Sequence, residues 1–357
     1  LEKHNSILEK VTFEENINPQ IIETLIKCVN DHLYLIHDYL KIKSEFLEIQ
    51  NPHLYDFGVS LDSNLKIKYS IEEAIEIIKN ALKPLGEEYL KVVELLMEKG
   101  HIDAELDENK HQAITFSWNT YSFMNFRGSY VDIKNLIHEL GHIVNYYLSK
   151  QNQPYIYEDS TIALGRASFT DEIASITNEI LLNKYLYENA KTEEERLFYL
   201  SKEVENYFTT IFKQTMYTEF ENNLYQIVSD EEQLSPQILN EKYLIIQRKY
   251  YGEHVEYDDI SSIEWTRLGH LYRWSYYPYK YATGLIIASI VVNSLMNEKS
   301  LSKEKYLEFL SSGSSLNPLD LLNMINIDFT NSNIISNGLQ VMQNDIEELE
   351  KILALRK

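Results

Sequence analysis

Length, composition and charge set the outer limits on what this chain can be. It has 357 residues, a mass of 42.0 kDa and 44% hydrophobic residues, so it can bury a large core. Its formal net charge is −22, its sequence pI is about 4.9, and no basic block stands out. We therefore expect no nucleic-acid partner and no membrane partner, because nucleic acids and anionic membranes repel an acidic surface.

The cysteine count and the N-terminus indicate the compartment. Cys28 is the only cysteine, which excludes an internal disulfide, and its apolar helical surroundings predict a buried, unreactive thiol. No signal peptide opens the chain, and the most apolar window, residues 285–296, is too short to span a bilayer. We therefore expect a cytoplasmic location. A chain that opens on Leu1 is also compatible with a fragment of a longer protein.

Apolar residues recur at three- and four-residue spacing along most of the chain, which predicts a mainly α-helical fold. The first predicted helix covers residues 18–49, and the second runs from Ser70 to Gly100 with a kink at Pro84. Residues 151–165 are expected to form a loop. Later helices are predicted over residues 168–186, 192–228, 235–251, 278–296, 301–310, 318–324 and 338–353.

One stretch departs from the helical period. Residues 111–126 are rich in β-branched and aromatic side chains and contain two short apolar runs, 113–116 and 121–126. They predict a small sheet beside the helix that follows, with an edge to which an extended peptide could pair. Because no repeat or clear linker interrupts the chain, we expect residues 1–357 to form a single domain.

The segment from Asn135 to Asn145 contains the pattern H-E-x-x-H. On a helix, His138 and His142 point from one face, where two neutral imidazoles can bind a single Zn²⁺. Glu139 lies one step round the helix, from where its carboxylate can act as a general base toward a water on the metal. The same pattern can also arise by chance, on a helix that carries two surface or core histidines.

The residues around this motif favour a helix. Ser129 and Asp132 form the pattern of a capping box, and an apolar stripe follows on a face other than that of the histidines. The stripe consists of Ile133, Leu136, Ile137, Leu140 and Val144. Gly141 inside the helix costs about 1 kcal/mol relative to alanine. This predicts that another part of the chain passes close to the backbone there.

A catalytic zinc site needs a third protein ligand and an open position. The best candidate is Glu172, in a predicted helix that also carries Asp171 and Glu179. Glu172 and Glu179 share one helix face, so one carboxylate can bind the metal while the other orients a histidine. Spacing alone does not choose among these three carboxylates.

Two stretches, the H-E-L-G-H motif and E-I-A-S-I-T-N-E about thirty residues later, resemble the thimet-oligopeptidase family of zinc metallopeptidases, and within it the oligoendopeptidase F branch. The resemblance covers the chain from about residue 17. Further matching stretches are residues 214–221, 265–270, 276–284 and 306–314.

The resemblance implies a helical, clamshell-like fold with a deep substrate channel. It also implies one zinc ion per chain, bound by His138, His142 and Glu172, with Glu139 as the general base. Two departures from the family bear on the channel. The N-terminal region is short, so part of the channel wall is expected to be missing or to come from another chain, either a second copy or a separate N-terminal segment. The run over residues 112–117 lacks the Gly-Ala-Tyr pattern of the family.

The same resemblance implies roles for residues near position 270. His270, Tyr277 and Tyr281 would donate hydrogen bonds to the oxyanion that forms when water attacks a peptide carbonyl. Each such donor is typically worth about 10²- to 10³-fold in rate. Tyr277 and Tyr281 lie one helical turn apart, whereas Tyr279 is expected to point elsewhere. The sequence does not decide which tyrosine serves.

The expected function is that of a zinc-dependent endopeptidase that hydrolyses internal bonds of short, unstructured peptides, because a channel admits a single extended chain. Two alternatives stay open. A carboxypeptidase of the same fold would release single residues from the C-terminus. A homologue without catalytic activity would bind peptides without cutting them.

Overall fold

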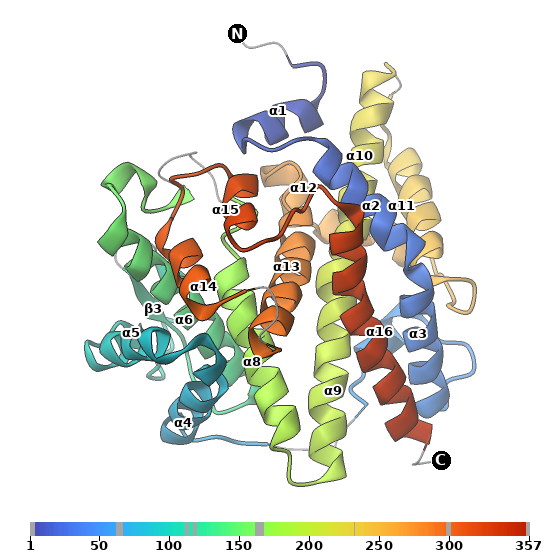
Figure 1. Ribbon diagram of the computed structural model, residues 1–357. Coiled ribbons are helices and arrows are strands. Elements are labelled where there is room, and N and C mark those ends of the chain that lie inside the picture. Colours follow the sequence, from blue (N-terminus) through green and yellow to red (C-terminus); the bar gives the residue numbers. More distant parts are fainter. Residues whose placement is uncertain are drawn as a thin grey trace. The chain divides into compact units, whose positions relative to one another are not determined.

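The computed structural model describes residues 4–61, 67–110, 114–116, 120–160, 168–231, 233–297 and 301–354 (Figure 1). The contacts between residues divide the chain into two compact units. Unit 1 consists of residues 1–63, 200–283 and 330–357, and unit 2 of residues 64–199 and 284–329. The single domain expected over residues 1–357 stays a prediction.

The mainly α-helical fold predicted from the sequence is confirmed. Unit 2 contains α4 (Ile71–Ala81), α5 (Glu87–Glu98), α6 (Tyr130–Asn152), α8 (Ile173–Glu188), α14 (Lys303–Ser311) and α15 (Pro318–Met324). Unit 1 contains α1 (Ile7–Glu14), α2 (Gln20–Asp31), α3 (Leu33–Phe46), α10 (Lys213–Ser229), α11 (Pro236–Tyr251), α12 (Gly269–Arg273) and α16 (Ser332–Ala354). Two helices, α9 (Glu193–Tyr207) and α13 (Tyr279–Met296), contribute residues to both units. Short 3₁₀ segments cover Leu54–Gly58, Lys83–Leu85, Tyr155–Tyr157 and Ser261–Arg267.

Two of the predicted helices are interrupted. Residues 18–49 form α2 and α3, which meet at His32. The His32 ring Nδ1 lies 2.7 Å from the Cys28 carbonyl oxygen, which would accept a backbone N–H if the helix continued. The second predicted helix forms α4 and α5, separated by a 3₁₀ turn that contains Pro84 and leads into Gly86 at a φ of 94°. Pro84 therefore lies at a helix break, where a kink was predicted.

Unit 1 has its core among α2, α3, α10, α11 and α16. Cys28 on α2 is buried, as predicted, and burial is the main cause of the raised pKa of its thiol. α9 continues through one π-helical turn, Phe208–Phe212, into α10, so the helical character predicted over residues 192–228 is confirmed. The last helix, α16, begins at Ser332, earlier than the predicted residue 338.

Unit 2 is built around the packing of α6 against α8, with α5 and α14 also in contact with α6. The predicted capping box is confirmed, because Ser129 accepts the Asp132 N–H and the Asp132 carboxylate accepts the Ser129 N–H. Before it, Gly128 has a φ of 81°, and its carbonyl accepts the Tyr69 N–H at 2.9 Å. A Cβ on Gly128 would stand 2.4 Å from the Tyr69 carbonyl oxygen. The start of α6 is therefore tied to the segment that leads into α4.

A three-stranded sheet precedes α6 in the chain. Its order is β1 (Ile102–Asp103), β3 (Tyr121–Phe123) and β2 (Ile114–Phe116), with β1 parallel and β2 antiparallel to β3. Since β2 and β3 contact α6, the predicted sheet beside the motif helix is confirmed, although β1 was not predicted. Residues 111–113 and 117–119 lie outside the described residues, so the run over residues 112–117 is described only in β2.

Gly141 lies where α6 crosses α8. A Cβ there would stand 2.6 Å from Ser175 Cα and 2.8 Å from the Ala174 carbonyl oxygen, and both are backbone atoms. The close passage predicted from this glycine is confirmed, and the neighbour is the first turn of α8. This contact brings Glu172, the residue directly before α8, next to the motif helix.

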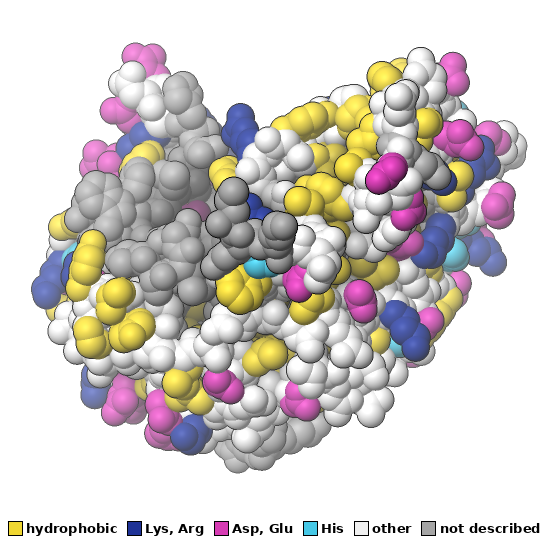
Figure 2. Space-filling model, turned by 90° about the horizontal axis from the view of Figure 1, so that it is seen from above, with side chains coloured by type: hydrophobic (Ala, Val, Ile, Leu, Met, Phe, Trp, Pro, Cys, Tyr) yellow, Lys and Arg dark blue, Asp and Glu magenta, His cyan; other side chains and the backbone are white. Residues whose placement is uncertain are grey.

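The expectations about partners stay predictions. Among the described residues, α13 alone is long and apolar enough to cross a membrane, and 72% of its apolar window is buried within the protein. A buried core helix shows the same composition, so this helix is weak evidence for a membrane. On the face shown in Figure 2, Lys and Arg side chains lie dispersed among Asp and Glu side chains.

Replacement of Gly141 with alanine is expected to lower the free energy of unfolding by about 1–3 kcal/mol, because a new methyl group would overlap the α8 backbone. This loss outweighs the gain in helix propensity, which is about 1 kcal/mol at most. Denaturant-induced unfolding, monitored by circular dichroism, measures this change in the free energy of unfolding. Gly58→Ala is the control, because no atom lies within 4 Å of its added Cβ. A Gly141→Ala protein as stable as the wild type would contradict the close contact.

Candidate metal centre

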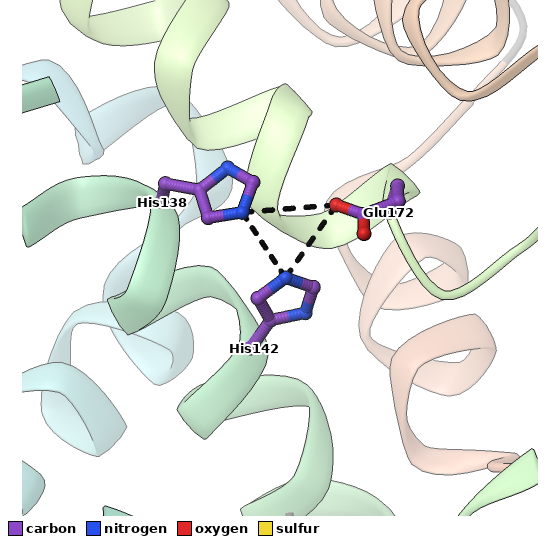
Figure 3. Close-up of side chains that lie close together, drawn as sticks. All are labelled: His138, His142 and Glu172. Carbon is purple, nitrogen blue, oxygen red and sulfur yellow. Dashed lines mark hydrogen bonds and ion pairs between the residues drawn. The ribbon is translucent and has the colours of Figure 1, made fainter. Parts of the chain in front are cut away.

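Three side chains of unit 2 converge on one point (Figure 3). His138 and His142 come from successive turns of α6, and Glu172 comes from the turn that leads into α8. The two Nε2 atoms lie 3.2 Å apart, and Glu172 Oε2 lies 3.7 Å from the first and 3.5 Å from the second. The exposed fractions of the three side chains are 25%, 12% and 21%, so the cluster is largely buried.

The geometry of this cluster fits a zinc ion. A tetrahedral ion with bonds of about 2.0–2.2 Å keeps its ligand atoms about 3.3–3.6 Å apart, close to the three observed separations. When both rings are neutral and their Nε2 atoms carry no proton, these nitrogens and the carboxylate are electron-pair donors that a cation between them attracts. Three protein donors also leave one position of a tetrahedral ion open, as a catalytic site requires.

A partly buried chain of charged groups holds the His138 ring. Glu179 hydrogen-bonds through Oε1 with His138 Nδ1, and its Oε2 lies 2.9 Å from Lys134 Nζ. Burial lowers the pKa of His138, but the hydrogen bond and charge of Glu179, with the charge of Glu172, raise it to about 9. Burial raises the pKa of Glu179, and Lys134 and His138 outweigh this and lower it. The ring is thereby fixed with Nε2 toward the cluster. Lys134 was not predicted, although it lies one helical turn before His138 on the same face.

Glu172 is oriented by the first turn of α8. The Ser175 hydroxyl donates to Glu172 Oε2 at 3.1 Å, and Ser175 is fully buried. Burial raises the pKa of Glu172, but the nearby His142 and His138 lower it to about 2, so the carboxylate is ionised at neutral pH. Because Ser175 also packs on Gly141, one turn of helix both orients this carboxylate and sets the distance between α6 and α8.

The tertiary structure separates the three carboxylates that spacing leaves equivalent. Glu172 faces both histidines, and Glu179 binds the outer nitrogen of the first. Asp171 makes different contacts, since it accepts hydrogen bonds from the Ser160 hydroxyl and, at 2.8 Å, from the Ser168 N–H. Of the three, the geometry favours Glu172 as the metal ligand and Glu179 as the group that orients His138.

Tyr146 contacts the second histidine and was also not predicted. Its ring stacks on the His142 ring with centroids 6.0 Å apart and an interplanar angle of 13°. Burial, and then the charges of nearby carboxylates, raise the pKa of Tyr146, so its hydroxyl is neutral. His142 Nδ1 is buried and has no hydrogen bond to any described residue. The stacked Tyr146 ring therefore limits rotation of His142 together with the contacts of its Nε2 with His138 and Glu172. With 27 tyrosines in the chain, no sequence signal singles out this one.

Glu139 lies on α6 between the two histidines and is 8% exposed. Its negative charge is one of the causes of the raised pKa of His138, which indicates that its carboxylate lies near that ring. Its role as a general base stays a prediction.

The predicted oxyanion donors come together within unit 1. Tyr277 stacks on His270 with centroids 5.1 Å apart and an interplanar angle of 1°, and the Tyr281 ring lies 5.9 Å from His270 and 5.5 Å from Tyr277. Burial lowers the pKa of His270, so its ring is neutral at pH 7. Tyr279 points elsewhere, since its hydroxyl donates to the Glu15 carboxylate. Because α13 begins at Tyr279, Tyr277 lies before the helix, although one continuous turn was expected to link it to Tyr281.

A helical fold that presents two histidines of an H-E-x-x-H motif and a glutamate from a second helix is typical of metallopeptidases. Comparison with known proteins gives the family. The family model described as "Peptidase family M3" matches residues 1–341, so the chain belongs to peptidase family M3. The resemblance to the oligoendopeptidase F branch is also confirmed. Over 357 residues the chain is 31% identical to oligopeptidase PepF of Bacillus subtilis. The aligned region covers 99% of this chain and 52% of PepF.

Two solved structures share this fold. A candidate peptidase from Chlamydophila abortus is 28% identical, with a TM-score of 0.88 over 98% of this chain and 58% of that one. The oligoendopeptidase-F from Enterococcus faecium is 27% identical, with a TM-score of 0.77 over 99% of this chain and 56% of that one. The chain thus spans about half the length of the curated relatives that it matches.

Replacement of Glu179 with glutamine is expected to weaken Zn²⁺ binding by about 10- to 100-fold, because the carboxylate orients His138 and makes it more basic. Competition with a chromogenic zinc chelator measures this affinity. Glu188→Gln is the matched control, since it removes an exposed carboxylate from the same helix, and it should bind zinc as the wild type does. Equal affinities of the two variants would show that Glu179 does not support the site.

In the metal-free protein, stability is expected to fall as the pH rises from about 6.5 to 9. The pKa of His138 is about 9 in the folded state and about 6.5 in an unfolded chain. Across this range the folded state keeps a proton that the unfolded state releases, so stability decreases by about 2–3 kcal/mol. Denaturant unfolding after treatment with EDTA, at pH 6.5 and pH 9, measures the change. Glu179→Gln should reduce it, and a wild-type stability that does not vary would contradict the raised pKa.

Proposed function

We propose that this chain acts as a zinc-dependent endopeptidase on short, unstructured peptides. The observation that carries the proposal is the convergence of His138, His142 and Glu172 at separations that suit a zinc ion, in a member of peptidase family M3. The names of similar proteins support the substrate class, since one is an oligopeptidase and another an oligoendopeptidase. Because the chain spans only 52% and 56% of these two proteins, its activity and substrates are proposals.

Each residue of the candidate metal centre has a role in this proposal. His138, His142 and Glu172 hold the ion, which when bound polarises a carbonyl and makes a coordinated water more acidic. Glu139 takes a proton from the attacking water and passes it to the nitrogen that leaves the cleaved peptide bond. Glu139 is suited to this transfer because it lies on the helix of both histidines and is shielded from bulk water.

His270, Tyr277 and Tyr281 are proposed to stabilise the oxyanion on the former carbonyl. A neutral imidazole and two phenols offer N–H and O–H donors, and such donors lower the barrier only when they are fixed in place before the reaction. The mutual contact of the three rings within unit 1 supports a shared role: Tyr277 stacks on His270, and the Tyr281 ring meets both edge-on. Tyr279 is left out of this set because its hydroxyl is bound to a buried carboxylate.

Several features of the proposal extend beyond the site itself. Zinc is preferred for this set of nitrogen and oxygen ligands, although Co²⁺ and Mn²⁺ bind the same donors.

We propose a cytoplasmic location on the basis of the single, buried Cys28. A second copy of the chain, or a separate N-terminal segment, is the proposed source of any missing wall of the substrate channel.

Replacement of Glu139 with glutamine is expected to leave about one zinc per chain and to lower peptide hydrolysis by about 10²- to 10⁴-fold, because the variant retains the ligands but loses the general base. The substrate is an internally quenched peptide of about ten residues, and metal content is measured on both proteins. If both proteins bind zinc and neither cuts any peptide in a varied panel, the peptide-binding alternative replaces the enzyme.

Mass spectrometry of the products separates the two peptidase alternatives. Internal fragments of one peptide indicate an endopeptidase, whereas a series of products that differ by single C-terminal residues indicates a carboxypeptidase. The second result would replace the endopeptidase by a carboxypeptidase that uses the same candidate metal centre.

A further inference from the structure

Of the three proposed oxyanion donors, Tyr277 is the one whose backbone lies outside a described helix. His270 belongs to α12 and Tyr281 to α13, and Tyr277 lies in the segment between them. The preceding residue, Tyr276, has a φ of 55°, in the left-handed region that residues other than glycine rarely adopt. A backbone in that region persists only when contacts around it hold it in place. The position of the Tyr277 ring therefore depends on what holds Tyr276.

A buried carboxylate on α10 holds this segment. Glu221 is 1% exposed, and its Oε1 accepts the Tyr276 backbone N–H at 2.8 Å. The Tyr225 hydroxyl lies 3.1 Å from the same carboxylate oxygen and 2.8 Å from the Ser275 hydroxyl, so it joins both. The Tyr276 hydroxyl donates to the Asn222 side-chain oxygen at 2.8 Å. One face of α10 thus binds two consecutive residues of the segment, through the backbone of one and the side chains of both.

Glu221 has an unusual environment for a charged residue. Its other oxygen, Oε2, is buried and has no hydrogen bond to any described residue. Burial raises the pKa of Glu221 to about 7. A carboxyl group is costly to bury when its few partners are a backbone N–H and a phenol. The contact with Tyr276 is therefore the structural feature that this side chain most directly provides.

A second buried carboxylate holds the residues that follow Tyr277 in the chain. Glu15, fully buried after α1, accepts a hydrogen bond from Tyr279 and lies 2.8 Å from Lys280 Nζ. Lys280 Nζ in turn lies 5.1 Å from the centroid of the Tyr277 ring, within the range of a cation–π contact. The residues before and after Tyr277 are thus both held by carboxylates from distant parts of unit 1.

We propose that Glu221 is a positioning residue for Tyr277: it accepts the Tyr276 N–H and so keeps the Tyr277 ring stacked on His270. This proposal rests on the proposed function, because it gives Glu221 an effect on the reaction through Tyr277. Glu221 touches neither the substrate nor the metal centre in this account. It fixes a donor in place before the reaction, which is the condition for such a donor to be effective.

A double-mutant cycle tests the link between these two residues. Tyr277→Phe should lower kcat by about 10²-fold, through loss of one oxyanion donor. Glu221→Met should lower kcat by about 10-fold or more with a smaller change in KM, because the donor remains but is displaced. In the Tyr277→Phe background, Glu221→Met should have little further effect, since both changes act through the same hydroxyl. An equal loss of kcat in both backgrounds would overturn the proposal.

Conservative and control variants separate positioning from a loss of stability. Glu221→Gln keeps an acceptor for the Tyr276 N–H and should retain most of the wild-type kcat. Glu219→Met is the matched control on the same helix, where the native carboxylate accepts hydrogen bonds from Asn30, Lys249 and Tyr250. It should lower the thermal midpoint and leave kcat unchanged. A loss of kcat in Glu219→Met as large as in Glu221→Met would overturn the proposal. If Glu221→Met does not fold, Glu221→Asp replaces it, because the shorter side chain places the carboxylate farther from the Tyr276 N–H. Glu221→Asp should then lower kcat in the wild-type background and have little further effect in the Tyr277→Phe background.

An NMR titration of His270 tests the positioning without catalysis. In the wild type, burial lowers the pKa of His270. In Glu221→Met the Tyr277 ring should move off His270, and the pKa should rise toward its ordinary value of about 6.5. An unchanged His270 pKa would overturn the proposal. If the wild type cuts no peptide, the proposed function fails, whereas this titration still decides whether Glu221 positions the ring.

Discussion

The close contact between α6 and α8 is the constraint on which the candidate metal centre depends. α6 carries both histidines, whereas the third candidate ligand, Glu172, and the Ser175 hydroxyl that orients it come from α8 and the turn before it. Gly141 allows the two backbones to approach until Ser175 Cα occupies the space that a side chain would fill. His142 Nε2 lies 3.5 Å from Glu172 Oε2, and a wider spacing between the helices would separate these two atoms. Packing and metal chemistry therefore depend on the same few atoms.

Buried carboxylates orient aromatic and imidazole rings in both units. In unit 2, Glu179 holds His138 and is itself neutralised by Lys134. In unit 1, Glu221 holds the backbone before Tyr277, and Glu15 holds Lys280. Buried charges cost free energy unless they are paired or hydrogen-bonded, and in both units the partners of these carboxylates are residues of the proposed site or residues next to it in the chain. A site works only when the side chains that bind or donate are held by a second layer of contacts.

The two units carry different parts of the proposed chemistry. The candidate metal ligands and the proposed general base belong to unit 2, and the proposed oxyanion donors belong to unit 1. The family assignment covers residues 1–341 and so includes both sets of residues.

The sequence by itself determined the features that depend on local spacing. It indicated the helical class, the capping box at Ser129, the paired histidines on one face and the close approach at Gly141, because each follows from helix periodicity or from the chemistry of one residue. It also led, through resemblance, to the family. It predicted a kink at Pro84, where the structure has a helix break, but it did not determine the break at His32 or the strand β1, which depend on contacts that periodicity does not show.

Only the tertiary structure shows which of three carboxylates faces both histidines and what holds the proposed oxyanion donors. Asp171, Glu172 and Glu179 are equivalent by spacing and become distinct only when α8 packs against α6 and turns each side chain toward a different partner. Glu221 and Tyr277 are far apart in the sequence, and no motif links them. They are connected through Tyr276, whose backbone N–H donates a hydrogen bond to the Glu221 carboxylate, and such a bond exists only once the chain has brought the two segments together.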